Sequence, residues 1–141
     1  WYFHVGSGHY RRSMGYVENM VYQIHQLLKA PPEKVNGKTF YLGDNPPLDL
    51  YDFANEIQKE LGVRKIRHMP FWIARLAAKA GDILKYVGWR KVPLTSDRLS
   101  HIRTDYVFDL HPIIEISGPL PYDFKTGIRR TIQWMCEKGE I

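Results

Sequence analysis

The sequence predicts a mixed α/β fold that is rich in helix and contains only a few short strands. Apolar residues recur at three- and four-residue spacing through two long segments, 16–30 and 70–87, as they do in amphipathic helices. The aromatic and β-branched runs that are typical of strands are short. The chain has 141 residues, 44% of them hydrophobic, which suits one domain with a modest core.

The first elements are expected to be a strand, a glycine turn and a helix. Residues 1–5 are aromatic and β-branched, which favours a strand, and Gly6-Ser7-Gly8 then predicts a turn. The helix should cover 16–30, and Pro31-Pro32 should stop it because proline cannot continue a helix.

A second strand and a second helix are predicted next. Residues 38–43 are flanked by glycines and predict a short strand, and 44–47 predict a turn. Asp49 is a suitable N-cap for the helix that follows, and Gly62 should close that helix. Its expected core face consists of Leu50, Phe53, Ala54, Ile57 and Leu61.

The segment 63–69 is expected to form a strand, and Pro70 suits the first turn of a long helix. Gly88 should end this helix, and Gly81 weakens it slightly. Its apolar stripe consists of Ile73, Leu76, Ala77, Ala80, Ile83, Leu84 and Val87.

The last third predicts a short helix through Leu99 and Ile102, a strand at 106–108 and one or two helical turns over 111–116. A final helix is expected over 123–138. The residues of this helix that should face inward are Phe124, Ile128, Ile132 and Met135.

Charge and composition exclude several classes of protein. The net charge is +5, but the positive residues are scattered and spell out no nucleic-acid module, so isolated arginines fit an anionic small molecule better. No segment has the length of apolar sequence that a membrane span needs, so no membrane partner is expected. Cys136 is the single cysteine, and the six histidines lack metal-ligand spacing, so we expect no disulfide, no metal site and a cytoplasmic location.

Several short motifs follow one another in a specific order, and together they cover nearly the whole chain. In order, they are Gly6-Ser7-Gly8, Arg12, Tyr16-Val17-Glu18-Asn19, the run Gly37 to Asp44, Leu48-Asp49-Leu50, Met69-Pro70-Phe71-Trp72, Val107-Phe108-Asp109, the run Gly118 to Phe124, and finally Gly127, Thr131 and Trp134. This order resembles the C-terminal half of the extended short-chain dehydrogenase/reductases, the NAD-dependent epimerase/dehydratase family of oxidoreductases and isomerases. Its 3β-hydroxysteroid and sterol dehydrogenase branch is also similar.

The resemblance implies that residues 1–141 form a single substrate-binding region of an incomplete Rossmann-type fold. In the family, an N-terminal Rossmann half carries the nucleotide fingerprint and a catalytic Tyr-x-x-x-Lys pair. Here Gly6-Ser7-Gly8 is not followed by the required third glycine, and no tyrosine has a lysine four residues later. We therefore expect no catalytic and no cofactor-binding residue in this chain, with NAD or NADP held by an upstream Rossmann half.

Four residues are candidates for substrate binding by this resemblance. Arg12 matches an arginine that contacts the substrate diphosphate in nucleotide-sugar epimerases, and Arg98, in competition with Arg103, lies near a second one. A solvated surface arginine is the alternative for both. Tyr16 and Asn19 match the Tyr/His-Val-x-Asp/Asn element of the family. A structural role is favoured over direct substrate contact: the polar side chain would cap the helix start and tie the returning chain to the Rossmann body.

Three functions follow as hypotheses. The first is the substrate-binding portion of a nucleotide-sugar epimerase or dehydratase, which is not catalytically competent alone. The second is a fragment of a sterol dehydrogenase, with Phe71 and Trp72 lining an apolar pocket. The third is a non-catalytic binding module that forms a homodimer through an exposed face.

Overall fold

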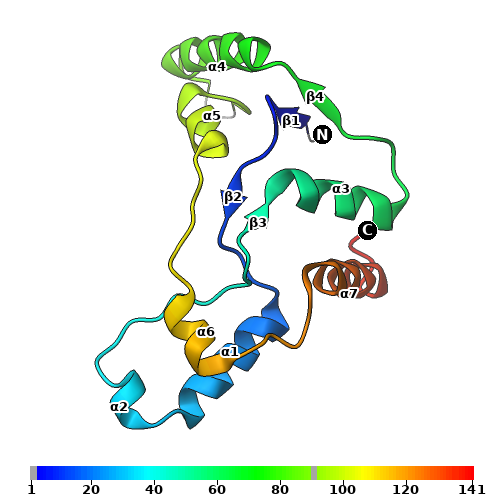
Figure 1. The fold of residues 1–141 in the computed structure, drawn as a ribbon. Coiled ribbons are helices and arrows are strands. Elements are labelled where there is room, and N and C mark those ends of the chain that lie inside the picture. The colour runs from blue at the N-terminus through cyan, green and yellow to red at the C-terminus, as the bar shows by residue number, and fades with distance from the viewer. Residues whose placement is uncertain (1–2, 90–91) are drawn as a thin grey trace.

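The computed structural model describes residues 3–89 and 92–141, and it confirms the helix-rich mixture of helices and short strands (Figure 1). Trp1 and Tyr2, which belong to the first predicted strand, lie outside these residues. The elements in chain order are β1 (Phe3–Val5), β2 (Arg11–Arg12), α1 (Val17–Lys29), α2 (Pro32–Val35), β3 (Leu48–Asp49), α3 (Leu50–Leu61), β4 (Arg67–Met69), α4 (Phe71–Tyr86), α5 (Ser96–Arg103), α6 (His111–Ser117) and α7 (Phe124–Glu137).

The helices are arranged as three pairs instead of surrounding one large core. Helix α1 packs on α6, α3 on α7, and α4 on α5. In Figure 1 the α4–α5 pair lies at one end of an elongated molecule and the α1–α6 pair at the other. A buried hydrophobic cluster between α4 and α5 contains only Ala74, Ala78 and Leu99.

The strands form two small two-stranded sheets. Strand β1 pairs in parallel with β4, and β2 pairs antiparallel with β3, where Arg12 lies opposite Leu48. The predicted strand at 106–108 is wrong except for a single bridge between Tyr106 and Arg12.

The predicted strand at 38–43 is also wrong. A strand needs a neighbouring backbone, and at Gly43 the backbone bonds go to a side chain instead. The amide of Gln23 donates to the Gly43 carbonyl at 2.8 Å and accepts from its N–H at 3.0 Å. Gln23 is fully buried, and it thereby fixes this extended segment against α1.

The helix boundaries follow the predicted local signals. The Asp49 carboxylate accepts hydrogen bonds from the N–H groups of Tyr51 and Asp52, and Gly62 closes α3 with φ +62°. Asp123 caps α7 in the same way. Sequence reasoning missed α2, because Pro31-Pro32 was interpreted only as a stop signal, whereas Pro32 occupies the first turn of a new short helix.

The apolar stripe of α4 faces solvent, and its small residues form the packed face. Ala74, Ala78 and Gly81 are buried, and a Cβ atom at Gly81 would lie only 1.9 Å from the carbonyl oxygen of Leu94. The approach of this backbone segment explains why glycine stands within the helix. Of the helices that the structure describes, none is both long enough and apolar enough to traverse a lipid bilayer.

Helix α1 shows the same inversion. Its buried residues are the polar Asn19 and Gln23, while its apolar stripe, made of Val17, Val21, Ile24 and Leu28, is exposed. Buried amides require hydrogen-bond partners, and these partners organise the candidate site described next.

Candidate functional site

A groove between α3 and α7 has a volume of about 1310 Å³. Helix α3 contributes Phe53, Ile57 and Leu61 of its expected core face, and α7 contributes its whole expected inward face. Most of these side chains are only half-buried. The apolar lining residues are Met14, Val17, Pro46, Pro47, Leu48, Phe53, Ile57, Leu61, Ile114, Pro119, Leu120, Phe124, Ile128, Ile132, Met135 and Ile141. Such a lining suits an apolar ligand or apolar part of a ligand.

A buried polar network around Asn19 borders one part of the groove, which we call its polar end. Its Nδ2 atom donates to Asp44 Oδ1 at 2.8 Å and to the Tyr122 carbonyl at 2.9 Å, and its Oδ1 atom accepts from the Tyr122 N–H at 3.1 Å. The second oxygen of Asp44 accepts from the Tyr16 N–H at 2.9 Å. Asp44, Tyr16 and Tyr122 all line the groove.

Asn19 thus ties the segment at Tyr122 to α1, whereas the expected capping of the helix start is wrong. The expected tie to a Rossmann body stays a prediction. The N-cap residue Tyr16 makes no side-chain capping hydrogen bond to α1. Asn19 does not cap the helix either, because its side-chain amide is bonded to Asp44 and Tyr122. Sequence reasoning assigned Asp44 only to a turn. No local signal in the sequence indicates this role, because it follows from the burial of Asn19, which needs partners from distant segments.

Charged and aromatic groups extend this end of the groove. The Tyr16 hydroxyl donates to Glu18 at 3.0 Å, and Arg130 forms an ion pair of 2.7 Å with the same carboxylate. The Arg130 guanidinium also lies over the Tyr122 ring, 4.6 Å from its centroid. Burial and the hydrogen bond to Glu18 raise the pKa of Tyr16, so its hydroxyl stays protonated and does not act as a base at neutral pH.

The Glu18 carboxylate is held in its ionised form. Burial opposes ionisation, but hydrogen bonds from Tyr122 and Tyr16 and the charge of Arg130 outweigh it and lower the pKa of Glu18. The arrangement can therefore orient a polar group at the groove's end, and Glu18 is not poised to take up a proton.

Arg12 lies on β2, away from this network. Its Nη2 atom donates to the His101 carbonyl at 2.8 Å, in the last turn of α5, and its guanidinium lies 5.0 Å from the centroid of the Tyr106 ring. Its Nε atom is buried and has no hydrogen-bond partner among the described residues. Arg12 does not line the groove, but Leu48, its partner in the β2–β3 sheet, does.

Arg98 is used locally. Its Nη1 atom donates to the carbonyls of Val92 and Pro93 at 2.9 and 3.1 Å, which fastens the loop before α5. Its competitor Arg103 lies over the Phe71 ring at 4.0 Å. Arg98 therefore lies on α5 and Arg12 contacts α5 from β2, whereas Tyr16 and Asn19 lie at the start of α1.

Histidines that are distant in sequence gather around Tyr51, which sequence reasoning did not predict. The ring centroids of His4, His9 and His68 lie 4.6, 4.5 and 5.7 Å from that of Tyr51. His9 also contacts Asp49 at 3.1 Å. Within residues 3–89 and 92–141, no group of metal-ligating side chains is arranged to hold an ion.

His4 makes stability depend on pH. It is 1% exposed, and burial lowers its pKa below the ordinary 6.5, with the nearby His68 and His9 acting in the same direction and Asn55 and Asp49 opposing. The unfolded chain then binds more protons, so stability is retained above pH 6.5 and falls as the pH drops below it.

Between neutral and acidic pH, we expect the free energy of unfolding to fall less for His4→Gln than for wild type, as measured by urea unfolding. His25→Gln, at an exposed site on α1, is the control, and an unchanged pH dependence in His4→Gln would contradict the assignment.

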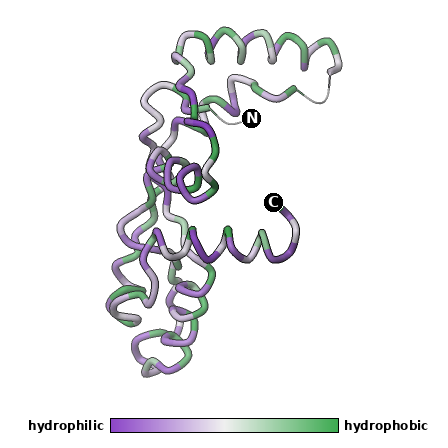
Figure 2. Tube along the Cα trace, turned by 90° about the vertical axis from the view of Figure 1, so that its right-hand side faces the viewer, coloured by the Kyte–Doolittle hydropathy of each residue, from purple (hydrophilic) through white to green (hydrophobic). Residues whose placement is uncertain are grey.

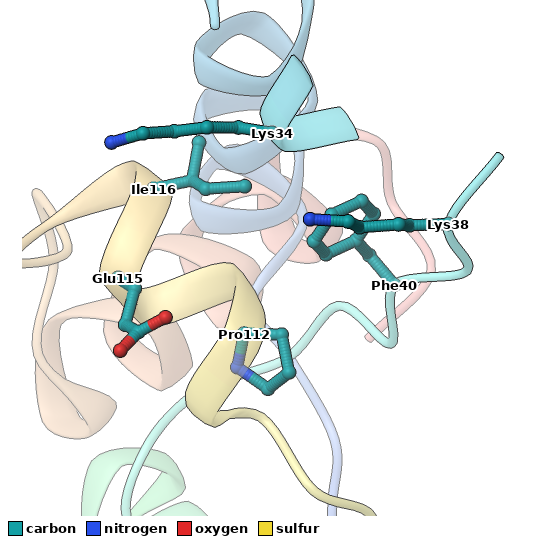
Figure 3. Close-up of a pocket in the computed structure, with 6 residues that line it drawn as sticks. All are labelled: Lys34, Lys38, Phe40, Pro112, Glu115 and Ile116. Atoms are coloured by element: carbon teal, nitrogen blue, oxygen red, sulfur yellow. The ribbon is translucent and has the colours of Figure 1, made fainter. Parts of the chain in front are cut away.

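A second, smaller hollow of about 230 Å³ lies between α2 and α6 (Figure 3). It is lined by Lys34, Lys38, Phe40, Pro112, Glu115 and Ile116. Both lysines and Glu115 are exposed to solvent, so the hollow has no buried polar group to fix a ligand. The α3–α7 groove is the better candidate site.

Comparison with known proteins shows two similar curated proteins. The chain is 27% identical over 132 residues to N-acetyl-alpha-D-glucosaminyl-diphospho-ditrans,octacis-undecaprenol 4-epimerase of Escherichia coli O157:H7, a match that covers 92% of this chain. It is also 27% identical over 150 residues to the uncharacterized protein y4nL of Sinorhizobium fredii strain NBRC 101917 / NGR234, which covers 96% of it. The chain spans 39% of the length of each relative. No protein-family model matches, and the solved structures give no significant match.

Proposed function

We propose that this chain supplies the substrate-binding surface of an epimerase-type oxidoreductase that acts on a diphosphate-linked sugar. The observation that carries the proposal is the similarity to an epimerase over 92% of the chain. The name of that relative describes a substrate in which a diphosphate joins a sugar to a polyprenol. A ligand of this kind has one anionic and one strongly apolar portion.

The proposal places the cofactor of such an enzyme, NAD or NADP, outside this chain, because Gly6-Ser7-Gly8 lacks the third glycine of the dinucleotide fingerprint. The turn at 6–8 is used for packing: a Cβ atom at Gly8 would lie 3.0 Å from the His4 ring, so Gly8 makes room for an imidazole. Catalytic chemistry and the dinucleotide are accordingly assigned to a Rossmann half outside residues 1–141.

The α3–α7 groove is proposed to hold the apolar portion of the substrate, and Arg12 its diphosphate. Support for the groove is its apolar lining, and support for Arg12 is the buried Nε donor that no described residue accepts. A guanidinium binds phosphate oxygens through permanent charge and several donors. Arg98 takes second place, because its Nη1 atom already serves two backbone carbonyls.

A sterol dehydrogenase is the second candidate, because the same apolar lining suits a sterol. The expected contribution of α4 to its pocket is not seen, since neither Phe71 nor Trp72 lines the groove. A binding and homodimerisation module is the third candidate, supported by the exposed apolar stripe of α1.

Ligand titration of the protein and its variants tests the proposal. The probes are an N-acetylglucosaminyl diphosphate with a short prenyl tail, a uridine diphosphate sugar and a sterol. We expect the prenyl-linked probe to bind best, and Arg12→Ala to weaken both diphosphates about tenfold through loss of a charge-assisted contact. Ile132→Asp should weaken the prenyl-linked probe by at least as much, because it places a charge in the groove.

Val21→Asp, on the exposed face of α1, is the matched control for Ile132→Asp, and circular dichroism verifies that each variant is folded. Equal affinity of wild type and Arg12→Ala for the diphosphates would remove Arg12 from the site. Binding of the sterol alone would favour the second candidate, and dimerisation without any ligand binding would favour the third.

A further inference from the structure

We infer that α4 docks this protein onto an anionic lipid surface, lying parallel to it. The surface concerned, called here the α4 face, consists of Trp72, Ile73, Leu76, Ile83, Leu84 and Val87. This inference is independent of the proposed function, because it concerns a surface that takes no part in the α3–α7 groove.

The α4 face is apolar and exposed along the whole helix. Trp72, Leu76, Ile83 and Val87 are 64%, 61%, 65% and 78% exposed. At 100° per residue these four project within one narrow sector, on the side of α4 opposite to the residues that pack on α5. Figure 2 shows hydrophobic residues recurring along this helix, which lies at one end of the molecule.

Positive charge flanks the α4 face. Arg75 and Lys79 are exposed, and the helical spacing places them along one edge of the apolar sector. The helix contains a single acidic residue, Asp82, which accepts a hydrogen bond of 3.1 Å from the Ser96 N–H and is thereby directed toward α5. The cations next to the apolar sector are therefore not neutralised by a carboxylate of α4.

This combination is the one that interfacial helices use. A helix with Trp and Leu on one side and Lys or Arg beside them inserts its apolar side at the boundary between headgroups and acyl chains, and anionic lipids strengthen the binding. Two further exposed aromatic residues, Tyr86 and Trp89, stand at the C-terminal end of α4, where amphipathic rings favour the headgroup level.

Comparison with α1 favours a lipid over a protein partner for the α4 face. The apolar stripe of α1 is exposed too, but its first turn carries the carboxylate of Glu18 and it lacks tryptophan. Of these two exposed apolar stripes, the one on α4 is therefore the better complement to an anionic surface. Because α4 has 16 residues and none of the described helices qualifies as a membrane span, it is expected to lie on the bilayer.

Vesicle flotation of the full chain tests this inference. The probes are unilamellar vesicles of phosphatidylcholine alone, and of phosphatidylcholine with about 30% phosphatidylglycerol, at low and high salt. We expect binding to the anionic vesicles that falls at high salt. The double variants Leu76→Ser/Ile83→Ser and Arg75→Glu/Lys79→Glu should each reduce the bound fraction at least tenfold. Both change exposed side chains, so they should keep the fold, which circular dichroism verifies.

Leu28→Ser is the control, because Leu28 is a leucine on α1 that is 80% exposed, even more than Leu76 at 61%. It should leave vesicle binding unchanged. Absence of binding to anionic vesicles, or binding that both α4 double variants retain, would overturn the inference. So would sedimentation showing that the α4 face holds two copies of the chain together while vesicles are not bound.

Discussion

Replacing Asn19 by alanine is expected to lower the free energy of unfolding by about 3 kcal/mol. The change removes three hydrogen bonds at a residue with no exposed surface, and it leaves the Tyr122 backbone groups and one oxygen of Asp44 unpaired. An unsatisfied buried polar group costs about 1–3 kcal/mol. Urea unfolding followed by circular dichroism measures the effect.

Asn19→Asp should be at least as destabilising, because it loses both donors and places a carboxylate beside Asp44. Gln133→Ala is the control: its amide bonds Glu137 at the surface of α7, and the expected change is below about 0.5 kcal/mol. A stability of Asn19→Ala equal to that of the control would show that the network does not hold the returning chain.

Gly81→Ala should destabilise the α4–α5 pair by about 2–3 kcal/mol. Alanine favours a helix over glycine by about 1 kcal/mol, so helix propensity alone predicts the opposite sign. The new Cβ atom would overlap the Leu94 carbonyl oxygen and approach Val92 to 2.9 Å, and backbone atoms cannot yield as a flexible side chain does. Thermal unfolding of the purified variant measures the net effect.

Ala80→Gly is the matched control, because it changes helix propensity at the adjacent, exposed position without altering the contact. It should cost about 1 kcal/mol. If Gly81→Ala were more stable than wild type, Leu94 would not lie against the helix as the structure shows it.

Local signals in the sequence were sufficient to predict most helices. Asp49 and Gly62 mark the two ends of α3, and Asp123 marks the start of α7, because capping depends on residues within one turn of each other. Asp105 and Asp109 accept hydrogen bonds from the backbone N–H groups of Arg11 and His111.

What the sequence did not reveal depends on contacts between distant segments. The run at 38–43 has the composition of a strand, yet the side chain of Gln23 takes the backbone bonds of Gly43. Periodicity identified α1 and α4 as amphipathic but did not indicate which side packs, because a helix buries the side that its neighbour fits. At α4 the neighbour is α5, which fits against alanine and glycine.

The candidate site was predictable in part. Tyr16 and Asn19 were singled out, and both belong to the polar end of the groove or its supporting network. The groove itself was not predicted, since α3 and α7 are far apart in sequence and each was assigned a core face. Substrate contact by Arg12 and Arg98 remains a prediction. Their hydrogen bonds to backbone carbonyls in and before α5 could not be predicted from the spacing of residues in the sequence.

The pairing of early helices with late ones has a consequence for biosynthesis. Helix α3 ends at Leu61 and its partner α7 begins at Phe124, so about 60 residues must be translated between them. At a translation rate of about 5–20 residues per second, the apolar side of α3 stays without its partner for about 3–12 s. Only α4 and α5, which are neighbours in the chain, can associate promptly during translation, so α1 and α3 are the segments for which a nascent-chain chaperone would compete.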